Sequence, residues 1–383
     1  MRNIKKKIFY IIFVVSFAGN GFFFLSNGLF EINRTIEKRQ ENRKQNVLNS
    51  LKDFEKILYE GGLFIIETGN ECFTPKKMGG VINNFRYNFK KYPKDELFTT
   101  SEMGYLMISV LERAVKENDQ KIIGYLKEIF EQYVISREII IVDQCLYGIV
   151  AINLYNLTGE EKYKVYADSM AEWLKTNYIS DIGILYRQRS SCNFVDGLGM
   201  YIPFLMEYSK FSSDATYETM AINCFDVFCK NGIDPQTGIA FHSYIITEPK
   251  IKMGSSNWGR GNAWMALAII CLPKEKLNSE AKMCVERFSE TMCAIYNKQG
   301  CLRQFINEGE LDLSATIPII YILERDSLMA VDKLSFSKFL RGKRGNILYF
   351  SSGPTTSSND YSPFRGPNML TQAIMLKWIL ECK

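Results

Sequence analysis

Apolar residues recur at spacings of three and four along most of the chain, which is the pattern of amphipathic and buried helices. Turn-type residues such as Thr158-Gly159 separate the apolar stretches. Two short β-type runs are seen at 184–186 and 347–350. The pattern predicts helices at 102–117, 119–134, 143–156, 159–175, 198–210, 213–230, 261–272, 277–296, 313–324 and 367–381.

Helices of similar length that follow one another in pairs predict an all-α fold built from helical hairpins. The absence of strand–helix alternation argues against a doubly wound sheet. An α-solenoid would also fit, but the chain shows no fixed repeat period. Long polar loops at 176–195 and 231–259 favour a closed toroid, in which such loops collect at one end. We therefore predict a ring of about six hairpins over residues 51–383.

The first 30 residues differ from the rest of the chain. A basic stretch, Arg2–Lys7, precedes an apolar run, Ile8–Ala18, as in a signal peptide. The apolar character continues, so that residues 8–30 are also long enough to span a bilayer. The sequence predicts export, with 1–30 as a cleaved signal peptide or a membrane anchor and 31–50 as a polar spacer. The basic residues favour a cytoplasmic N-terminus, with the rest periplasmic, membrane-anchored or extracellular.

Composition excludes several classes of function. Hydrophobic residues make up 46% and charged residues 23% of the 383 residues, which are globular values. The net charge of +5 is small, and basic residues are interspersed with acidic ones, so no nucleic-acid partner is expected. The chain has one histidine, and its ten cysteines have no metal-site spacing. We expect no metal, no cofactor and no disulfide framework, while the oligomeric state is left open.

The segment Asn257–Trp264 is chemically the most informative. It combines Trp258, Arg260 and Trp264 with glycines that allow a ligand to approach the backbone closely. An apolar run follows, which places these side chains at the start of a buried helix, where free N–H groups suit an anion. Trp offers a flat face for a sugar, and Arg offers a planar fork for a carboxylate. The segment predicts a site for an acidic sugar; the alternative is a tryptophan-anchored helix start with a surface arginine.

Two aspartates and the single histidine are further candidates. Asp143 opens a predicted helix, where it would also make a good N-cap. Asp196 has apolar neighbours, so burial would raise its pKa, as a general acid near neutral pH requires; helix capping is again the alternative. His242 lies in a loop shortly before Trp258, and a structural role is equally open. The aspartates are about one hairpin apart, so both could line one mouth of a toroid, and paired-carboxylate hydrolysis depends on their separation.

Several segments together resemble the unsaturated uronyl hydrolases, which form glycoside hydrolase families 88 and 105, the latter being the unsaturated rhamnogalacturonyl hydrolases. The resemblance covers about residues 100–380, and the order and spacing of the segments match. Two positions differ: Phe98–Gly104 stands where the family has an aromatic-rich segment, and Ala263 replaces a glycine. The similar segments are Val142-Asp143 with Leu154–Tyr163, Val195–Leu205, Phe241–Tyr244, Trp258–Trp264 and Leu313–Thr316.

The resemblance implies an (α/α)6 barrel and a glycoside hydrolase that acts on acidic oligosaccharides carrying a C4=C5 double bond, without a metal. Asp196 would be the acid/base that protonates C4 and helps water to add at C5. Asp143 would position the ring or the water. His242 and Arg260 would contact the substrate, Arg260 through the carboxylate, and Trp258 and Trp264 would shape the pocket.

Two other interpretations remain. A non-catalytic carbohydrate-binding toroid of a surface-polysaccharide system would need the tryptophans and Arg260 but neither aspartate. A different toroid hydrolase would use an ordinary paired-carboxylate mechanism. The presence of both Asp143 and Asp196 favours the uronyl hydrolase.

Overall fold

The computed structural model describes residues 48–73, 93–187, 189–342, 344–355, 360–362 and 365–381. The proposed signal peptide or anchor at 1–30 and most of the spacer at 31–50 lie outside these residues, so export and membrane attachment stay predictions. Among the described residues, no helix combines the length and the apolar character needed to cross a membrane.

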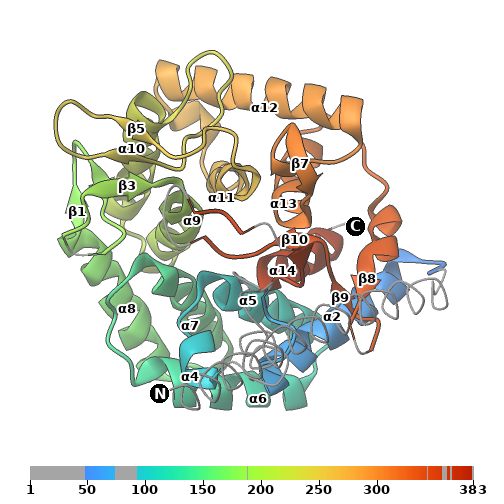
Figure 1. Ribbon diagram of the computed structural model, residues 1–383. Coiled ribbons are helices and arrows are strands. Elements are labelled where there is room, and N and C mark those ends of the chain that lie inside the picture. Colours follow the sequence, from blue (N-terminus) through green and yellow to red (C-terminus); the bar gives the residue numbers. More distant parts are fainter. Residues whose placement is uncertain are drawn as a thin grey trace, which may run out of the picture. The chain divides into compact units, whose positions relative to one another are not determined.

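Within the described residues, six helices form a closed inner ring (Figure 1). Each packs against the next one along the chain, and the last packs back against the first. The helical toroid predicted from the periodicity is therefore confirmed. The inner helices are α5 (Ser101–Lys116), α7 (Cys145–Thr158), α9 (Val195–Ser212), α11 (Gly259–Ile269), α13 (Leu313–Arg325) and α14 (Met369–Leu380).

Outer helices cover this ring. α6 packs on α5, α8 on α7 and α10 on α9, while α2 packs on α14 and α5 and α12 lies beside α10. Between α13 and α14 the chain has a 3-10 helix, Lys333–Phe339, in place of a long outer helix. The outer helices are α2 (Leu51–Thr68), α6 (Gln120–Phe130, continued by a π-helical turn at Glu131–Ile135), α8 (Glu161–Thr176), α10 (Ala215–Gly232) and α12 (Ser279–Gln299).

The two rings differ in sequence as their positions require. Helix α14 is apolar nearly all round, and Met369–Leu376 are all buried, as expected for a helix enclosed by others.

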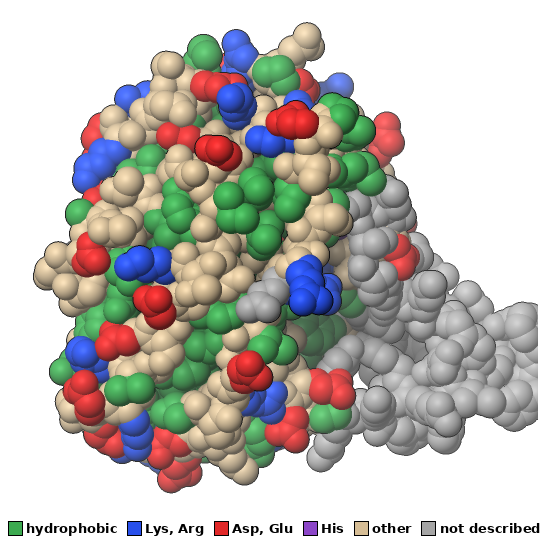
Figure 2. Space-filling view, turned by 90° about the vertical axis from the view of Figure 1, so that its left-hand side faces the viewer, with side chains coloured by type: hydrophobic (Ala, Val, Ile, Leu, Met, Phe, Trp, Pro, Cys, Tyr) green, Lys and Arg blue, Asp and Glu red, His purple; other side chains and the backbone are tan. Residues whose placement is uncertain are grey.

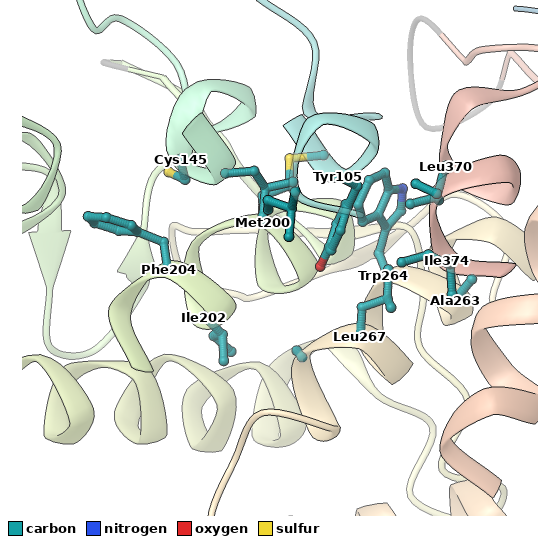
Figure 3. Packing of buried hydrophobic residues seen from close by; sticks show 14 of the residues in the cluster. Tyr105, Cys145, Met200, Ile202, Phe204, Ala263, Trp264, Leu267, Leu370 and Ile374 are labelled. Atoms are coloured by element: carbon teal, nitrogen blue, oxygen red, sulfur yellow. The ribbon is translucent and has the colours of Figure 1, made fainter. Parts of the chain in front are cut away.

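Close approach between inner helices depends on Gly199 of α9, since a Cβ there would lie 2.5 Å from the carbonyl oxygen of Trp264 on α11. The Tyr105 hydroxyl of α5 donates to the Gly199 carbonyl at 2.8 Å. Figure 3 shows Tyr105 and Trp264 side by side in this packing.

Short antiparallel strands occupy the loops between the helices. The largest sheet has the order β3-β4-β5 and pairs Phe194 with Ser243, which brings two distant loops together. The β-type runs predicted at 184–186 and 347–350 overlap β2 and β9. The strands are β1 (Tyr178–Ile179), β2 (Gly183–Ile184), β3 (Cys192–Phe194), β4 (Ser243–Ile245), β5 (Lys252–Met253), β6 (Arg303–Phe305), β7 (Glu308–Leu311), β8 (Leu340–Arg341), β9 (Ile347–Leu348), β10 (Ser351–Ser352) and β11 (Arg365–Gly366).

The surface carries charges of both signs. On the face shown in Figure 2, acidic and basic side chains alternate with apolar ones, and neither sign forms a continuous area. This distribution agrees with the interspersed charges of the sequence.

Candidate active site

The candidate site lies where the inner helices begin. In a ring of hairpins the inner helices run in the same direction, so their N-terminal ends meet at one mouth. The predicted residues sit at these ends: Asp143 just before α7, Asp196 in the first turn of α9 and Arg260 in the first turn of α11. Free backbone N–H groups and the positive dipole ends of the helices favour an anionic ligand at such a mouth.

Asp143 belongs to a 3-10 turn, Val142–Gln144, that precedes α7. It does not cap the helix, because the N-cap residue is Gln144. Instead, its Oδ2 accepts a hydrogen bond from the Tyr186 hydroxyl at 2.5 Å, and its Oδ1 lies 3.5 Å from the Ser101 hydroxyl. The side chain is therefore held by the first residue of α5 and by the loop that follows β2.

The environment of the Asp143 carboxyl group shifts its pKa toward neutrality. Burial raises the pKa of Asp143 to about 7, the hydrogen bond from Tyr186 lowers it, and the charges of Glu102 and Asp196 raise it further. Asp143 can therefore gain or lose a proton near neutral pH. The pKa of Asp143 thus lies in the range that proton exchange near neutral pH requires.

Replacing Tyr186 by Phe should raise the pKa of Asp143 further, because the hydroxyl stabilises the ionised carboxylate. A hydrogen bond to a charged group contributes about 1.5–3 kcal/mol, so the upward shift should be on the order of one unit. Titration of 13C-carboxyl-labelled aspartate by NMR, assigned with Asp143→Asn, measures it. An unchanged or lower midpoint would contradict this role of Tyr186.

Asp196 lies in the first turn of α9, with 16% of its side chain exposed. Its Oδ2 is 3.8 Å from Nε2 of His242, too far for a direct hydrogen bond but close enough for electrostatic interaction. Its Oδ1 is buried and has no hydrogen-bond partner among the described residues. Since Phe194 is the N-cap residue, capping does not explain Asp196. One carboxylate oxygen is thus available to a ligand.

Strand pairing places His242 beside Asp196. The His242 carbonyl accepts from the Val195 amide at 3.0 Å, just where β3 leads into α9. The ring is 3% exposed, its Nδ1 is 3.2 Å from the Tyr361 hydroxyl, and its centroid is 4.3 Å from that of Trp258. His242, which the sequence places in a loop, is thus held by these contacts and forms one wall of the site.

Trp258 and Arg260 form the start of α11. The Arg260 Nη2 donates to the Ser352 carbonyl at 2.8 Å, to the Ser352 hydroxyl at 2.7 Å and to the Gly353 carbonyl. The guanidinium lies over the Trp258 ring, 5.9 Å from its centroid. Nε of Arg260 and the indole N–H of Trp258 are buried and have no partner among the described residues. Buried donors without partners are rare, and a ligand would satisfy these two.

Trp264 occupies a different position. Its ring is 2% exposed and lies between inner helices, with its centroid 6.0 Å from that of Tyr105, as Figure 3 shows. In this structure Trp264 contributes to the packing behind the start of α11, and its direct contact with substrate stays a prediction.

Sequence reasoning missed four side chains at this mouth. Tyr186 and Ser101 hold Asp143, Tyr361 contacts His242 and accepts from the Ser255 amide at 2.9 Å, and Glu102 faces both Arg260 and Asp196. The sequence did give one indication of Glu102, because it falls in the segment 98–104 that differs from the family pattern. The tyrosines had none, because only folding brings them near the aspartates.

The match of sequence to a known family decides the class of protein. Residues 82–331, more than half of the chain, match the family described as Glycosyl Hydrolase Family 88. The chain belongs to this family. This family 88 protein is therefore a glycoside hydrolase, and the resemblance drawn from its motifs is confirmed. No curated protein sequence gives a significant match.

Several solved structures have folds similar to that of this family 88 chain. A possible family 105 member from Klebsiella pneumoniae superposes with a TM-score of 0.64 at 15% identity, covering 88% of this chain and 93% of the other. The unsaturated glucuronyl hydrolase of Bacillus sp. GL1 gives 0.62 at 14% identity, with 87% and 95% covered. An α-1,6-mannanase from Salegentibacter sp. HEL1_6 gives 0.58 at 16% identity, with 86% and 98% covered. At these identities the similarity establishes a shared fold, and the last case shows that one such fold serves different substrates.

Proposed function

We propose that this enzyme hydrolyses oligosaccharides ending in an unsaturated uronate, by adding water across the C4=C5 double bond. The observation that carries the proposal is the pairing of Asp143 and Asp196 at one mouth, where burial raises the pKa of Asp143 to about 7. Family membership supports the proposal. The buried N–H groups of Trp258 and Arg260 support it as well, because they have no acceptor among the described residues.

The chemistry follows from the substrate's enol ether. The ring oxygen donates electron density into C4=C5, so C4 accepts a proton and positive charge develops on C5 and the ring oxygen. Water then bonds to C5 and gives up a proton to a carboxylate. The resulting hemiketal breaks its C5–ring oxygen bond, leaving a ketone at C5 and a hemiacetal at C1, which releases the remaining sugar. The reaction needs a proton donor at C4 and a proton acceptor for the water, and one carboxyl group can serve as both in turn.

We assign the acid/base role to Asp196 and the positioning role to Asp143. Oδ1 of Asp196 has no partner among the described residues and can face the reacting atoms, while Oδ2 is oriented by His242. Both oxygens of Asp143 face hydroxyl groups of the protein, which suits a group that holds the sugar ring or the water.

The substrate carboxylate is proposed to lie against the start of α11. Nε of Arg260 and the first N–H groups of the helix offer donors there, and an anion is favoured at this helix end. His242 and Trp258 form the adjoining wall, on which a sugar ring can stack.

Replacing Arg260 by Lys tests this contact. Lysine keeps the charge but loses the Nε–H and the planar fork, so KM for the unsaturated uronide should rise by roughly 10-fold or more. The loss of the bonds to Ser352 and Gly353 should also lower the melting temperature. Steady-state kinetics and thermal unfolding separate the two effects. An unchanged KM with a lower melting temperature would show that Arg260 only anchors the C-terminal segment.

The activity itself is tested with disaccharides made by a polysaccharide lyase. Hydration removes the conjugated double bond, so the ultraviolet absorbance of the enoate should fall on incubation with the enzyme, whereas the saturated disaccharide is a matched control that should stay intact. Binding of acidic oligosaccharides without any loss of absorbance would support the non-catalytic toroid. Cleavage of saturated substrates would support an ordinary paired-carboxylate hydrolase.

A further inference from the structure

A third carboxyl group, that of Glu102, lies at the mouth and has no role in the reaction described above. Glu102 is the second residue of α5, and it faces Arg260 and Asp196. Its Oε2 lies 3.3 Å from the hydroxyl oxygen of Ser101. The same hydroxyl lies 3.5 Å from Oδ1 of Asp143. One serine therefore stands between two carboxyl groups.

The Ser101 hydroxyl cannot donate a hydrogen bond to both carboxyl groups at once. A serine hydroxyl has one hydrogen to donate and can also accept, whereas an ionised carboxylate only accepts. If both carboxyl groups were ionised, one of them would face the lone pairs of the serine oxygen without a donor. With one proton added, every contact of this bridge has a donor and an acceptor: Asp143 donates to Ser101, and Ser101 donates to Glu102.

We infer that Glu102, Ser101 and Asp143 hold one proton between them, and that Glu102 is a positioning residue that keeps the proton on Asp143. The negative charge then resides on Glu102, beside Arg260. The part of this inference that concerns catalysis rests on the proposed function, whereas the shared proton does not.

The surrounding charges favour this arrangement. Burial raises the pKa of both carboxyl groups, which disfavours two negative charges here. Arg260 lowers the pKa of Glu102 and so favours the charge on that residue, while Asp196 raises the pKa of both. Tyr186 acts in the opposite direction on Asp143. The other titratable groups that sense the charge on Asp143 are Cys145 and Tyr147 of α7, whose own pKa values burial raises well above the ordinary range, so they stay neutral.

A shared proton has a consequence for the substrate. With both carboxyl groups ionised, the mouth would repel a uronate, whereas the protonated pair has one negative charge fewer. Losing this proton as the pH rises should therefore weaken binding of the anionic sugar. Glu102 determines the pH at which the loss occurs.

Carboxyl titration of the full chain tests the shared proton without any substrate. In protein labelled with 13C-carboxyl aspartate, Glu102→Gln removes the neighbouring charge, so the midpoint of Asp143 should fall by at least about half a unit. Glu96→Gln, at an exposed position on the preceding short helix α4 (Lys94–Leu97), is the matched control and should leave the midpoint unchanged.

Coupling between two groups is reciprocal, which supplies a second measurement should Glu102→Gln fail to fold. In protein labelled on glutamate, Asp143→Asn should lower the midpoint of Glu102 by a similar amount. Midpoints that do not move in either experiment would overturn the inference.

The pH profile of double-bond hydration then tests the catalytic part. In Glu102→Gln, the alkaline limb of kcat/KM should move to lower pH by the same shift that NMR records. A shifted NMR midpoint with an unshifted limb would keep the shared proton and reject its role in catalysis. A wild type that hydrates no unsaturated uronide would reject the proposed function and leave the NMR result standing.

Discussion

Replacing Asp196 by Asn is expected to lower the rate of double-bond hydration by roughly 10²- to 10⁴-fold, the usual contribution of general acid–base catalysis. Asparagine keeps the shape of the side chain but can neither donate the proton to C4 nor accept one from water. Substrate binding should persist, because the proposed sugar contacts come from Trp258 and Arg260. Single-turnover measurement of the enoate absorbance, together with a binding titration, separates the two quantities.

The matched control is Asp181→Asn, an exposed aspartate in the turn between β1 and β2, which should react at the wild-type rate. Asp143→Asn provides the comparison within the site and should also slow the reaction. If Asp196→Asn retained nearly full activity while Asp143→Asn lost it, the proton donor would be Asp143, whose pKa already lies near neutrality.

Gly199→Ala should cause a large loss of stability for the addition of a single methyl group. The added Cβ would meet the carbonyl oxygen of Trp264 at 2.5 Å and its ring at 2.8 Å, where two inner helices touch. Overpacking of this kind costs about 1–3 kcal/mol. Gly199 is one helical turn from Asp196, and Trp264 is one turn from Arg260, so activity should fall as well. Denaturant unfolding and the hydration assay measure the two losses.

Gly124→Ala is the control for this prediction. Gly124 also lies inside a helix, α6, but a Cβ there would have no atom within 4 Å. Alanine should therefore stabilise the protein by about 0.5–1 kcal/mol through its helix propensity and its smaller unfolded-state entropy. Equal effects at both positions would show that the contact between α9 and α11 is not tight.

Periodicity predicted the helices because each element carries its own signal. The helix predicted at 313–324 is observed at Leu313–Arg325, and the one at 213–230 at Ala215–Gly232. The start of α9 was placed three residues late because Val195–Gly197 contains an aspartate and a glycine, which indicate a turn. In the structure, strand pairing of β3 starts the helix directly after Phe194, and tertiary contacts override the local preference.

The site could be predicted only where one segment holds several of its groups. Trp258 and Arg260 are close in sequence, and their spacing revealed them. The partners of Arg260 are 92 and 93 residues away, and no local pattern indicates them. The helix dipole favours an acidic residue in the first turn of any helix, including exposed ones. The residue type at Glu102 therefore did not reveal that its carboxyl group is buried.

The closure of the inner ring bears on how the chain acquires its structure. Helix α14 closes the inner ring where the Ser109 hydroxyl of α5 donates to the Ala373 carbonyl at 2.9 Å. It is also bonded to the outer helix α2, because Nε2 of Gln372 donates to the Leu58 carbonyl at 2.8 Å. These contacts join residues more than 260 positions apart. While the chain is being synthesised, the faces of α5 and α13 that pack on α14 stay uncovered until α14 emerges. Non-local closure of this kind is slow and leaves apolar surface open to aggregation, so the packing of α14 determines when the mouth and its aspartates become fixed.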